Sequence, residues 1–189
     1  MRSRHRHPDR RSRADPFERR ITIANGEVQG KLPYDYLIFA LGRRLATERI
    51  MGFYEHAHHL MNVEKALKFR KALDHFHDGR AVIGQAPGAR LPVPVYETAF
   101  ALSQLLKDRN ERAGVKIIIV SPTTPGREFG DNEVAGAIRT VLYEHEIEFI
   151  PDFAVSRVTF GAVHNSLGQG IRFNLLMLIP PFQGLESRF

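Results

Sequence analysis

The chain contains no cysteine among its 189 residues. This absence excludes disulfide bonds, metal sites built from thiolates and catalysis by a thiol nucleophile, and it leaves the redox state of the compartment undetermined. The sequence also lacks an apolar run of about 18 residues, the length that a membrane-spanning helix needs. The charged N-terminus is not followed by the apolar core of a secretory signal.

The sequence also lacks the motifs that indicate catalysis or phosphate binding. There is no Ser/His/Asp elbow, no Walker loop and no HExxH sequence. The loop that begins GQAPGA at Gly84 lacks the three-glycine spacing that brings a pyrophosphate to a helix N-terminus. Pro92 and Pro94 remove two backbone N–H donors where the next helix should begin. This loop is therefore not predicted to hold the phosphates of NAD(P).

Excess positive charge is confined to the first twenty residues. They hold eight Arg and three acidic residues, a net charge of +5 out of +6 for the whole chain. Such a segment could contact nucleic acid or anionic lipid, or serve as a transit peptide. Because no aromatic residues alternate with the arginines to stack on bases, we predict no nucleic-acid partner. We interpret residues 1–16 as a disordered Arg-rich leader.

The most informative stretch runs from Arg80 to Pro122. A short apolar run ending at Gly84 is followed by a loop with Gly88 and three prolines, and then by residues 95–107 with apolar side chains at helical spacing. The run VKIIIV at 115–120 is typical of a strand buried on both faces. This order predicts a βαβ unit of an α/β, Rossmann-like three-layer domain, with ligands expected at the 84–94 loop beyond the strand's carboxyl end.

Further elements are expected on both sides of this unit. Asn25-Gly26 predicts a hairpin turn, and Asn62 and Asp131 are predicted N-caps of helices ending near His77 and His145. The remaining expected strands are 34–41, 147–150, short antiparallel strands within 153–163 and 170–173, and a buried strand at 174–179. The resulting division is a leader at 1–16, part of a first domain with a linker at 17–60, a Rossmann-like domain at 61–174 and a return strand at 175–189.

Histidines occur in two groups that invite a metal interpretation. His56, His58 and His59 form the first group, but no acidic or thiol partner has suitable spacing, which favours a solvated loop. His75 and His77 are two residues apart and cannot share one face of a helix, so we do not predict a ligand pair. Arg43 and Arg44, which follow a strand ending in Gly42, are interpreted as solvated rather than as an anion site. No metal site is predicted.

Four stretches in this order resemble the FAD-dependent pyridine nucleotide-disulfide oxidoreductase superfamily, and within it the sulfide:quinone oxidoreductase branch. They are ITIANGEV with LPYDYLIFALG between residues 21 and 42, AVIGQAPGARLPVPVYETAFAL from 81, FGDNEVAGAIRTVLYEHEIEFIPD from 129, and NLLMLIPPFQG from 174. In the second stretch, Pro94, Tyr96 and Glu97 match the branch's helix start. The resemblance covers residues 15–184.

The resemblance implies an FAD-dependent oxidoreductase that passes electrons from a small reductant such as sulfide to flavin and then to a quinone. It implies that Ala40, Leu41 and Gly42 form a turn close to the flavin, and that Pro181 and Phe182 lie near the isoalloxazine ring. No catalytic acid, base or nucleophile is assigned. Glu97 is expected to stabilise the first turn of its helix through the helix dipole.

Two departures from the branch limit this expectation. Members of the branch carry a redox cysteine before the Tyr-Glu pair, where this chain has Ala86, and persulfide chemistry needs a thiolate. The glycine-rich FAD fingerprint is also missing, which suggests an internal fragment of a longer protein. Without a GxGxxG sequence in the second domain, NADH is disfavoured as the direct donor.

A different class of function remains open from the sequence. The chain could be a non-enzymatic α/β interaction module, or a decayed relative without cofactor, whose apolar strand edges pair with a complementary chain or a second copy. Under the oxidoreductase interpretation the isolated chain is expected to be inactive and to bind FAD weakly or only with a complementary chain. We expect a cytoplasmic protein, with peripheral membrane association where a quinone is the acceptor.

Overall fold

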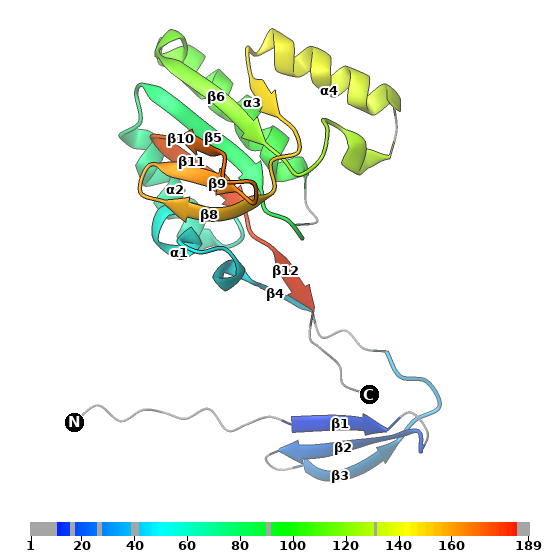
Figure 1. Ribbon diagram of the computed structural model, residues 1–189. Helices are drawn as coiled ribbons and strands as arrows, with labels where there is room; N and C mark the ends of the chain where they lie inside the picture. The colour runs from blue at the N-terminus through cyan, green and yellow to red at the C-terminus, as the bar shows by residue number, and fades with distance from the viewer. Residues whose placement is uncertain are drawn as a thin grey trace, which may run out of the picture. The chain divides into compact units, whose positions relative to one another are not determined.

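The computed structural model describes residues 11–15, 18–25, 28–38, 42–89, 92–130 and 132–184. The chain divides into two compact units, one made of Met1–Gly42 with Gly184–Phe189 and the other of Arg43–Gln183 (Figure 1). The second unit begins before and ends after the 61–174 range predicted from the sequence. The four-part division of the chain stays a prediction.

The first unit contains a three-stranded antiparallel sheet in the order β1-β2-β3. Its strands are β1 (Arg11–Asp15), β2 (Arg20–Asn25) and β3 (Val28–Pro33). Asn25 pairs with Val28, which confirms the hairpin predicted from Asn25-Gly26. Strand β1 lies within the leader expected to be disordered, so that expectation is wrong for these five residues. Polar side chains do not prevent a strand from pairing through its backbone.

The apolar segment at 34–41 was expected to be a buried strand. Its described part, residues 34–38, forms no strand, and the side chains of Tyr36 and Ile38 are 94% and 89% exposed. A strand of this composition needs neighbours that supply backbone partners and cover its faces. Within the described residues no strand pairs with this segment, so the expectation is wrong there.

The second unit is built on a parallel sheet in the order β11-β5-β6-β7. Its strands are β5 (Gly79–Gln85), β6 (Val115–Val120), β7 (Glu148–Ile150) and β11 (Leu175–Ile179). All five residues of β11 and five of the six residues of β6 are buried, as expected for strands covered on both faces. The predicted α/β, Rossmann-like fold class is confirmed.

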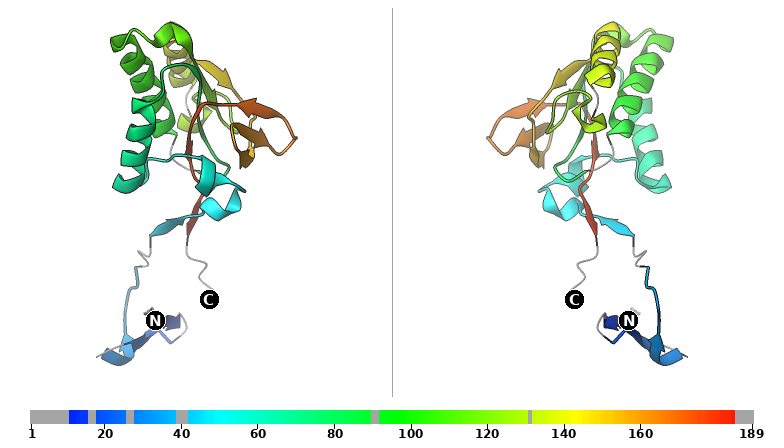
Figure 2. Two further views of the ribbon diagram at one scale, coloured as in Figure 1. Left: turned by 90° about the vertical axis from the view of Figure 1, so that its left-hand side faces the viewer. Right: turned by 90° about the vertical axis from the view of Figure 1, so that its right-hand side faces the viewer.

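Three helices cover one face of the parallel sheet (Figure 2). They are α2 (Val63–Asp74), α3 (Val93–Asp108) and α4 (Asn132–Glu144). Their apolar stripes pack on alternate strand residues such as Ile83, Ile117 and Met177. Asn62 caps α2 as predicted, because its side-chain oxygen accepts from the backbone N–H of Lys65 at 2.9 Å. The expected cap Asp131 lies outside the described residues.

The opposite face of the sheet is covered by a small antiparallel sheet in the order β10-β9-β8 (Figure 2). Its strands are β8 (Val155–Thr159), β9 (Ala162–Asn165) and β10 (Gly170–Arg172), and helices η1 (Thr47–Arg49) and α1 (Phe53–His56) precede them in the chain. Phe53, Val158 and Val163 pack there against the other alternate residues of the parallel strands. The unit therefore has three layers, helices, sheet and antiparallel strands, with two apolar cores.

Short elements complete the second unit. Strands β4 (Arg43–Leu45) and β12 (Phe182–Gly184) form a two-stranded ladder. Helix η2 (Arg112–Gly114) precedes β6, and η3 (Arg127–Phe129) lies between β6 and α4. Because β4 follows Gly42 directly and β12 follows β11, this ladder continues the return strand beyond the carboxyl edge of the parallel sheet.

Candidate functional site

The candidate site lies where the parallel strands end. Ala86 follows β5, Ser121 follows β6 and Pro180 follows β11, and in a parallel sheet these ends meet at one edge. Open α/β sheets bind ligands in the crevice outside this carboxyl edge. The described loop residues Ala86–Ala89 and the return strand both leave the sheet here, so the site predicted from the 84–94 loop falls at this edge.

A buried polar pair joins the ends of β5 and β6. The side-chain amide of Gln85 donates to the hydroxyl oxygen of Ser121 at 3.2 Å, and both residues are at most 5% exposed. The Ser121 hydroxyl also accepts from the backbone N–H of Thr123 at 3.2 Å. The Gln85 carbonyl oxygen (Oε1) is buried without a hydrogen-bond partner among the described residues. Sequence reasoning missed this pair, although polar residues that end buried strands are a signal that could have found it.

The loop after β5 is fixed to the return strand by two backbone hydrogen bonds. The N–H of Ala86 donates to the carbonyl of Ile179 at 2.9 Å, and the N–H of Phe182 donates to the carbonyl of Gly88 at 3.3 Å. Gly88 has a φ of +83°, in the left-handed region that favours glycine. The glycine therefore allows the loop to turn back against Pro181 and Phe182.

Pro181 and Phe182, both predicted as site residues, lie together at this edge. Pro181 is buried, and its carbonyl accepts from the N–H of Ala46 at 2.8 Å. The ring of Phe182 is half-buried, with the guanidinium carbon of Arg43 6.0 Å from its centroid. An aromatic ring and a cation thus occupy the edge where the return strand leaves the sheet.

The two arginines that follow Gly42 have different surroundings. The Arg44 guanidinium donates to the side-chain oxygen of Gln183 and lies 2.6 Å from the carboxylate of Glu48. Hydrogen bonding, first to the backbone of Glu48 itself and then to Arg44, lowers the pKa of Glu48. Arg43 is exposed and contacts the Phe182 ring instead. Of the two, Arg43 is the one whose charge faces an aromatic surface.

The predicted turn Ala40-Leu41-Gly42 is only partly described. Gly42 has a φ of +71°, which supports a turn that needs glycine. Ala40 and Leu41 lie outside the described residues. Gly42 belongs to the first unit and Phe182 to the second, and each unit is described by itself. The role of this turn stays a prediction.

The helix after the loop begins earlier than the sequence predicted. Helix α3 starts at Val93, with Pro92 as its N-cap and Pro94 in its first turn, where the missing N–H groups cost nothing. Glu97 is exposed and lies beyond the first helical turn. The expectation that it interacts with the helix dipole is therefore wrong. Tyr96 is buried; its ring stacks on Phe149 and its hydroxyl accepts from the N–H of Gly126 at 3.2 Å.

The histidine-bearing segment before α2 is packed rather than solvated, so the expectation of a solvated loop is wrong. The N–H of His58 donates to the carbonyl of Leu176 at 3.0 Å, and its carbonyl accepts from the N–H of Leu178 at 2.9 Å. This segment therefore covers the edge of β11. His59 is 5% exposed. Burial, assisted by the charge of Lys65, lowers the pKa of both histidines.

No family model matches the chain. Among solved structures, it is similar to the sulfide:quinone oxidoreductase of the hyperthermophilic bacterium Aquifex aeolicus, with a TM-score of 0.75 and 26% identity over 94% of this chain and 43% of that one. It is also similar to NDH2 from Plasmodium falciparum in complex with RYL-552, with a TM-score of 0.59 and 18% identity over 89% of this chain and 39% of that one. The likeness to the NAD-dependent persulfide reductase from A. fulgidus has a TM-score of 0.54 and 19% identity over 92% of this chain and 31% of that one.

The likeness covers only part of each of these three proteins. It spans less than half the length of each of the three. The two likenesses below 25% identity support the fold alone, whereas the first adds sequence similarity across nearly the whole chain. The structural neighbours of this chain are therefore sulfide:quinone oxidoreductase and other FAD-dependent pyridine nucleotide-disulfide oxidoreductases, and the resemblance predicted from its sequence, to one part of that superfamily's structure, is confirmed.

Proposed function

We propose that the chain serves an FAD-dependent oxidoreductase of the sulfide:quinone oxidoreductase type. In this proposal electrons pass from a small reductant to flavin and then to a quinone. Pro181 and Phe182 contact the isoalloxazine ring, and Ala40, Leu41 and Gly42 form a second turn near the flavin. The observation that carries the proposal is the likeness to sulfide:quinone oxidoreductase, with a TM-score of 0.75 over 94% of this chain.

The residues at the carboxyl edge fit one part of FAD and not another. Phe182 offers a half-buried aromatic surface, and Arg43 adds a cation beside it, which suits a flat ring that gains negative charge on reduction. A pyrophosphate needs backbone N–H groups at a helix N-terminus. Helix α3 instead starts at Val93 between two prolines, the N-cap Pro92 and Pro94 in the first turn. We therefore assign ring contact, and no phosphate contact, to this edge.

The same geometry bears on the electron donor. The proline-bearing start of α3 also lacks two of the backbone donors that could seat the pyrophosphate of NADH. With no cysteine, the chain cannot form a persulfide by itself. The proposed donor is thus a small reductant that reacts at the flavin, and bound flavin supplies the two-electron chemistry. No residue of this chain is assigned as nucleophile, acid or base.

A complementary chain would supply the pyrophosphate site in this proposal, because a second copy of this chain lacks the same glycine-rich fingerprint. Among the described residues, no helix has the length and apolar character needed to cross a bilayer. A quinone acceptor resides in the bilayer, so we include peripheral association with a membrane in the proposal. The cytoplasmic location expected from the sequence is retained as part of it.

Titration of FAD with the purified chain, followed by flavin fluorescence, tests the ring contact. The proposal predicts saturable quenching, because an aromatic side chain stacked near the isoalloxazine ring quenches its emission. Phe182→Leu keeps an apolar side chain but removes the ring, and it should weaken binding roughly five- to tenfold, the worth of one aromatic stacking contact. Phe160→Leu, at a 94% exposed hairpin position, is the matched control and should leave the titration unchanged.

Two results would count against the proposal. Quenching that is identical in the wild type and in Phe182→Leu would show that flavin does not contact this edge. Complete absence of quenching at millimolar protein would favour the non-enzymatic interaction module, which retains the fold without a cofactor. Circular dichroism of each variant verifies that the fold is intact before binding is compared.

A further inference from the structure

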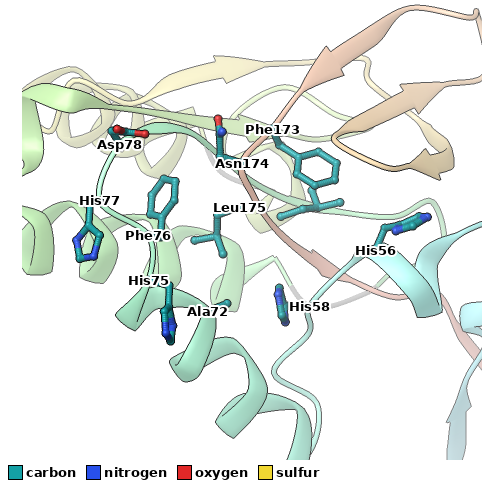
Figure 3. Close-up of a pocket in the computed structure, with 11 residues that line it drawn as sticks. His56, His58, Ala72, His75, Phe76, His77, Asp78, Phe173, Asn174 and Leu175 are labelled. Carbon is teal, nitrogen blue, oxygen red and sulfur yellow. The ribbon is translucent and has the colours of Figure 1, made fainter.

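A pocket of about 480 Å³ lies at the opposite, amino-terminal end of the parallel sheet. Its lining comes from α1, the segment before α2, the end of α2, the loop between α2 and β5, and the residues that lead into and begin β11 (Figure 3). The lining residues are His56, His58, Ala72, His75, Phe76, His77, Asp78, Phe173, Asn174, Leu175 and Leu176. The volume is that of a small-molecule site. Neither the resemblance nor the flavin proposal assigns it a role.

Hydrogen bonds join one wall of the pocket to β5. The N–H of Asn174 donates to the carbonyl of Arg80 at 2.8 Å, and its side-chain oxygen accepts from the N–H of Arg80 at 2.9 Å. Gly79, with a φ of +91°, leaves room for this amide, since a Cβ there would collide with the Asn174 side chain. In the view of Figure 3, Asn174 and Asp78 lie along one side of the pocket, and His58, Ala72 and His75 lie along the other.

Hydrogen bonds fix which nitrogen of two imidazoles carries the proton. His75 Nδ1 lies 2.8 Å from the backbone carbonyl of Lys71, and His77 Nδ1 lies 2.8 Å from a carboxylate oxygen of Glu111. Both oxygens can only accept, so each Nδ1 is the donor. In a neutral imidazole the Nε2 atom then keeps its lone pair. His75 and His77 therefore each offer a hydrogen-bond acceptor.

Imidazoles with fixed Nε2 lone pairs are typical metal ligands. The helical argument that separated His75 from His77 does not apply, because α2 ends at Asp74 and both residues lie beyond it. Even so, in the part of the chain that the structure describes, no three His, Cys, Asp or Glu residues come together as a metal site. The pocket is thus better suited to a molecule that spans several side chains than to a single ion.

The charged and titratable side chains are distributed unevenly along the pocket. Asp78 is its negative end, since apart from the histidines no other residue of this lining carries a formal charge. At the other end, burial and then the charge of Lys65 lower the pKa of His58, which favours the neutral form of that imidazole. Phe76 and Phe173 add aromatic surface between these ends. A carboxylate, acceptor nitrogens and aromatic faces together suit a cation.

We propose that this pocket binds a small organic cation of the amidinium or primary ammonium class. The charged head of the ligand hydrogen-bonds to the carboxylate of Asp78 and to an imidazole acceptor, and its apolar part packs against Phe76 and Phe173. The pocket lies at the far end of β11 from Pro181 and Phe182. The proposal is therefore independent of flavin binding and stands or falls separately from it.

Three ring compounds of one shape and different charge test this proposal. Benzamidinium, benzamide and benzoate are titrated into the full chain, and the imidazole Cε1–H signals of the histidines are followed by NMR. The expected result is saturable shifts of the His75 and His77 signals with benzamidinium, weaker shifts with benzamide and none with benzoate. Similar shifts with all three compounds, or none with benzamidinium up to about 10 mM, would overturn the proposal, because millimolar binding is already weak for a built site.

Two further measurements sharpen the test. Asp78→Asn keeps the shape and removes the charge, and it should weaken benzamidinium binding roughly five- to tenfold, as expected for a lost charge-assisted hydrogen bond. Asp152→Asn, at another exposed acid, should leave the affinity unchanged. Titration with Zn²⁺ alone separates the metal alternative. Tight binding of Zn²⁺ at His75 and His77 without benzamidinium binding would show a metal site instead.

Discussion

The backbone N–H of Phe182 donates to the carbonyl of Gly88 across 3.3 Å, which ties the return strand to the loop after β5. Two segments almost a hundred residues apart in sequence thereby form one edge. Gly88 makes the turn because its φ of +83° suits glycine, and Pro181 packs behind it. The aromatic surface that we propose for the flavin depends on this contact, since it fixes the backbone from which the Phe182 ring projects.

Gly84 is expected to tolerate no larger residue without a loss of stability. It pairs with Val120, and a Cβ at Gly84 would lie 2.5 Å from the Val120 carbonyl oxygen and collide with its side chain. Gly84→Ala should lower the free energy of unfolding by about 2–3 kcal/mol, the cost of overpacking a core. Urea denaturation followed by circular dichroism measures the change.

Gly136→Ala is the matched control. Gly136 lies inside α4, and nothing is within 4 Å of an added Cβ. Alanine there should raise the free energy of unfolding by up to about 1 kcal/mol, because glycine is the poorer helix former. Equal effects of the two substitutions would contradict the close approach of β5 and β6 at Gly84.

Arg112 is predicted to hold the amino-terminal end of the sheet together. Its guanidinium donates to the carbonyls of Val115 and His145, both at 2.7 Å, and to that of Glu146 at 2.9 Å. Arg112→Ala leaves these carbonyls without a charged donor and should cost about 2–3 kcal/mol of stability. Arg112→Lys keeps the charge but lacks the planar guanidinium with its several donors, so it should retain only part of the stability that Arg112→Ala loses.

The exposed Arg139 on α4 provides the comparison for Arg112. Arg139→Ala should change the free energy of unfolding by less than about 0.5 kcal/mol, as for most surface substitutions. Thermal and urea unfolding of both variants measure the difference. If Arg112→Ala were as mild as Arg139→Ala, the guanidinium would contribute little to joining these segments.

Acid should destabilise the second unit through His58 and His59. Burial, and secondarily Lys65, lower the pKa of both histidines in the folded chain. The unfolded state therefore binds protons first, so stability is unaffected well above about pH 6.5 and falls as the pH drops below that value towards the folded pKa. Urea unfolding at a series of pH values should show this decline.

The variant His59→Leu separates this effect from general acid denaturation. His59 is 5% exposed and packs against Phe53, so leucine can occupy the position without a charge to bury. The fall in stability between neutral and mildly acidic pH should be smaller in the variant than in the wild type. An unchanged decline would show that other groups determine the acid sensitivity.

The sequence predicted those parts of the fold whose patterns are local. Residues 80–84, 95–107 and 115–120 gave the central βαβ unit correctly, because burial on two faces and helical spacing are visible in a single segment. The prediction of a strand was wrong at residues 34–38, because a strand depends on pairing partners that the segment's own sequence does not specify. The prediction of disorder was wrong for strand β1 for the converse reason, since a polar segment there pairs with β2 through its backbone.

The candidate site was predictable only in part. The resemblance supplied Pro181 and Phe182, but the contact of Arg43 with the Phe182 ring depends on the β4–β12 ladder, which no local pattern predicts. The histidine-lined pocket brings together residues as distant in sequence as His56 and Asn174. Spacing rules cannot detect such a set, because its members share neither a helix face nor a strand.

The most direct test compares FAD, FMN and riboflavin in difference absorption titrations with the full chain. The carboxyl edge offers the half-buried ring of Phe182, and Pro92 and Pro94 remove two backbone N–H donors at the start of α3. We therefore predict that all three flavins bind weakly and with similar affinity, within about threefold of one another. Absence of any spectral change would contradict flavin contact at this edge. FAD binding tighter than riboflavin by tenfold or more would contradict the claim that this chain holds the ring alone.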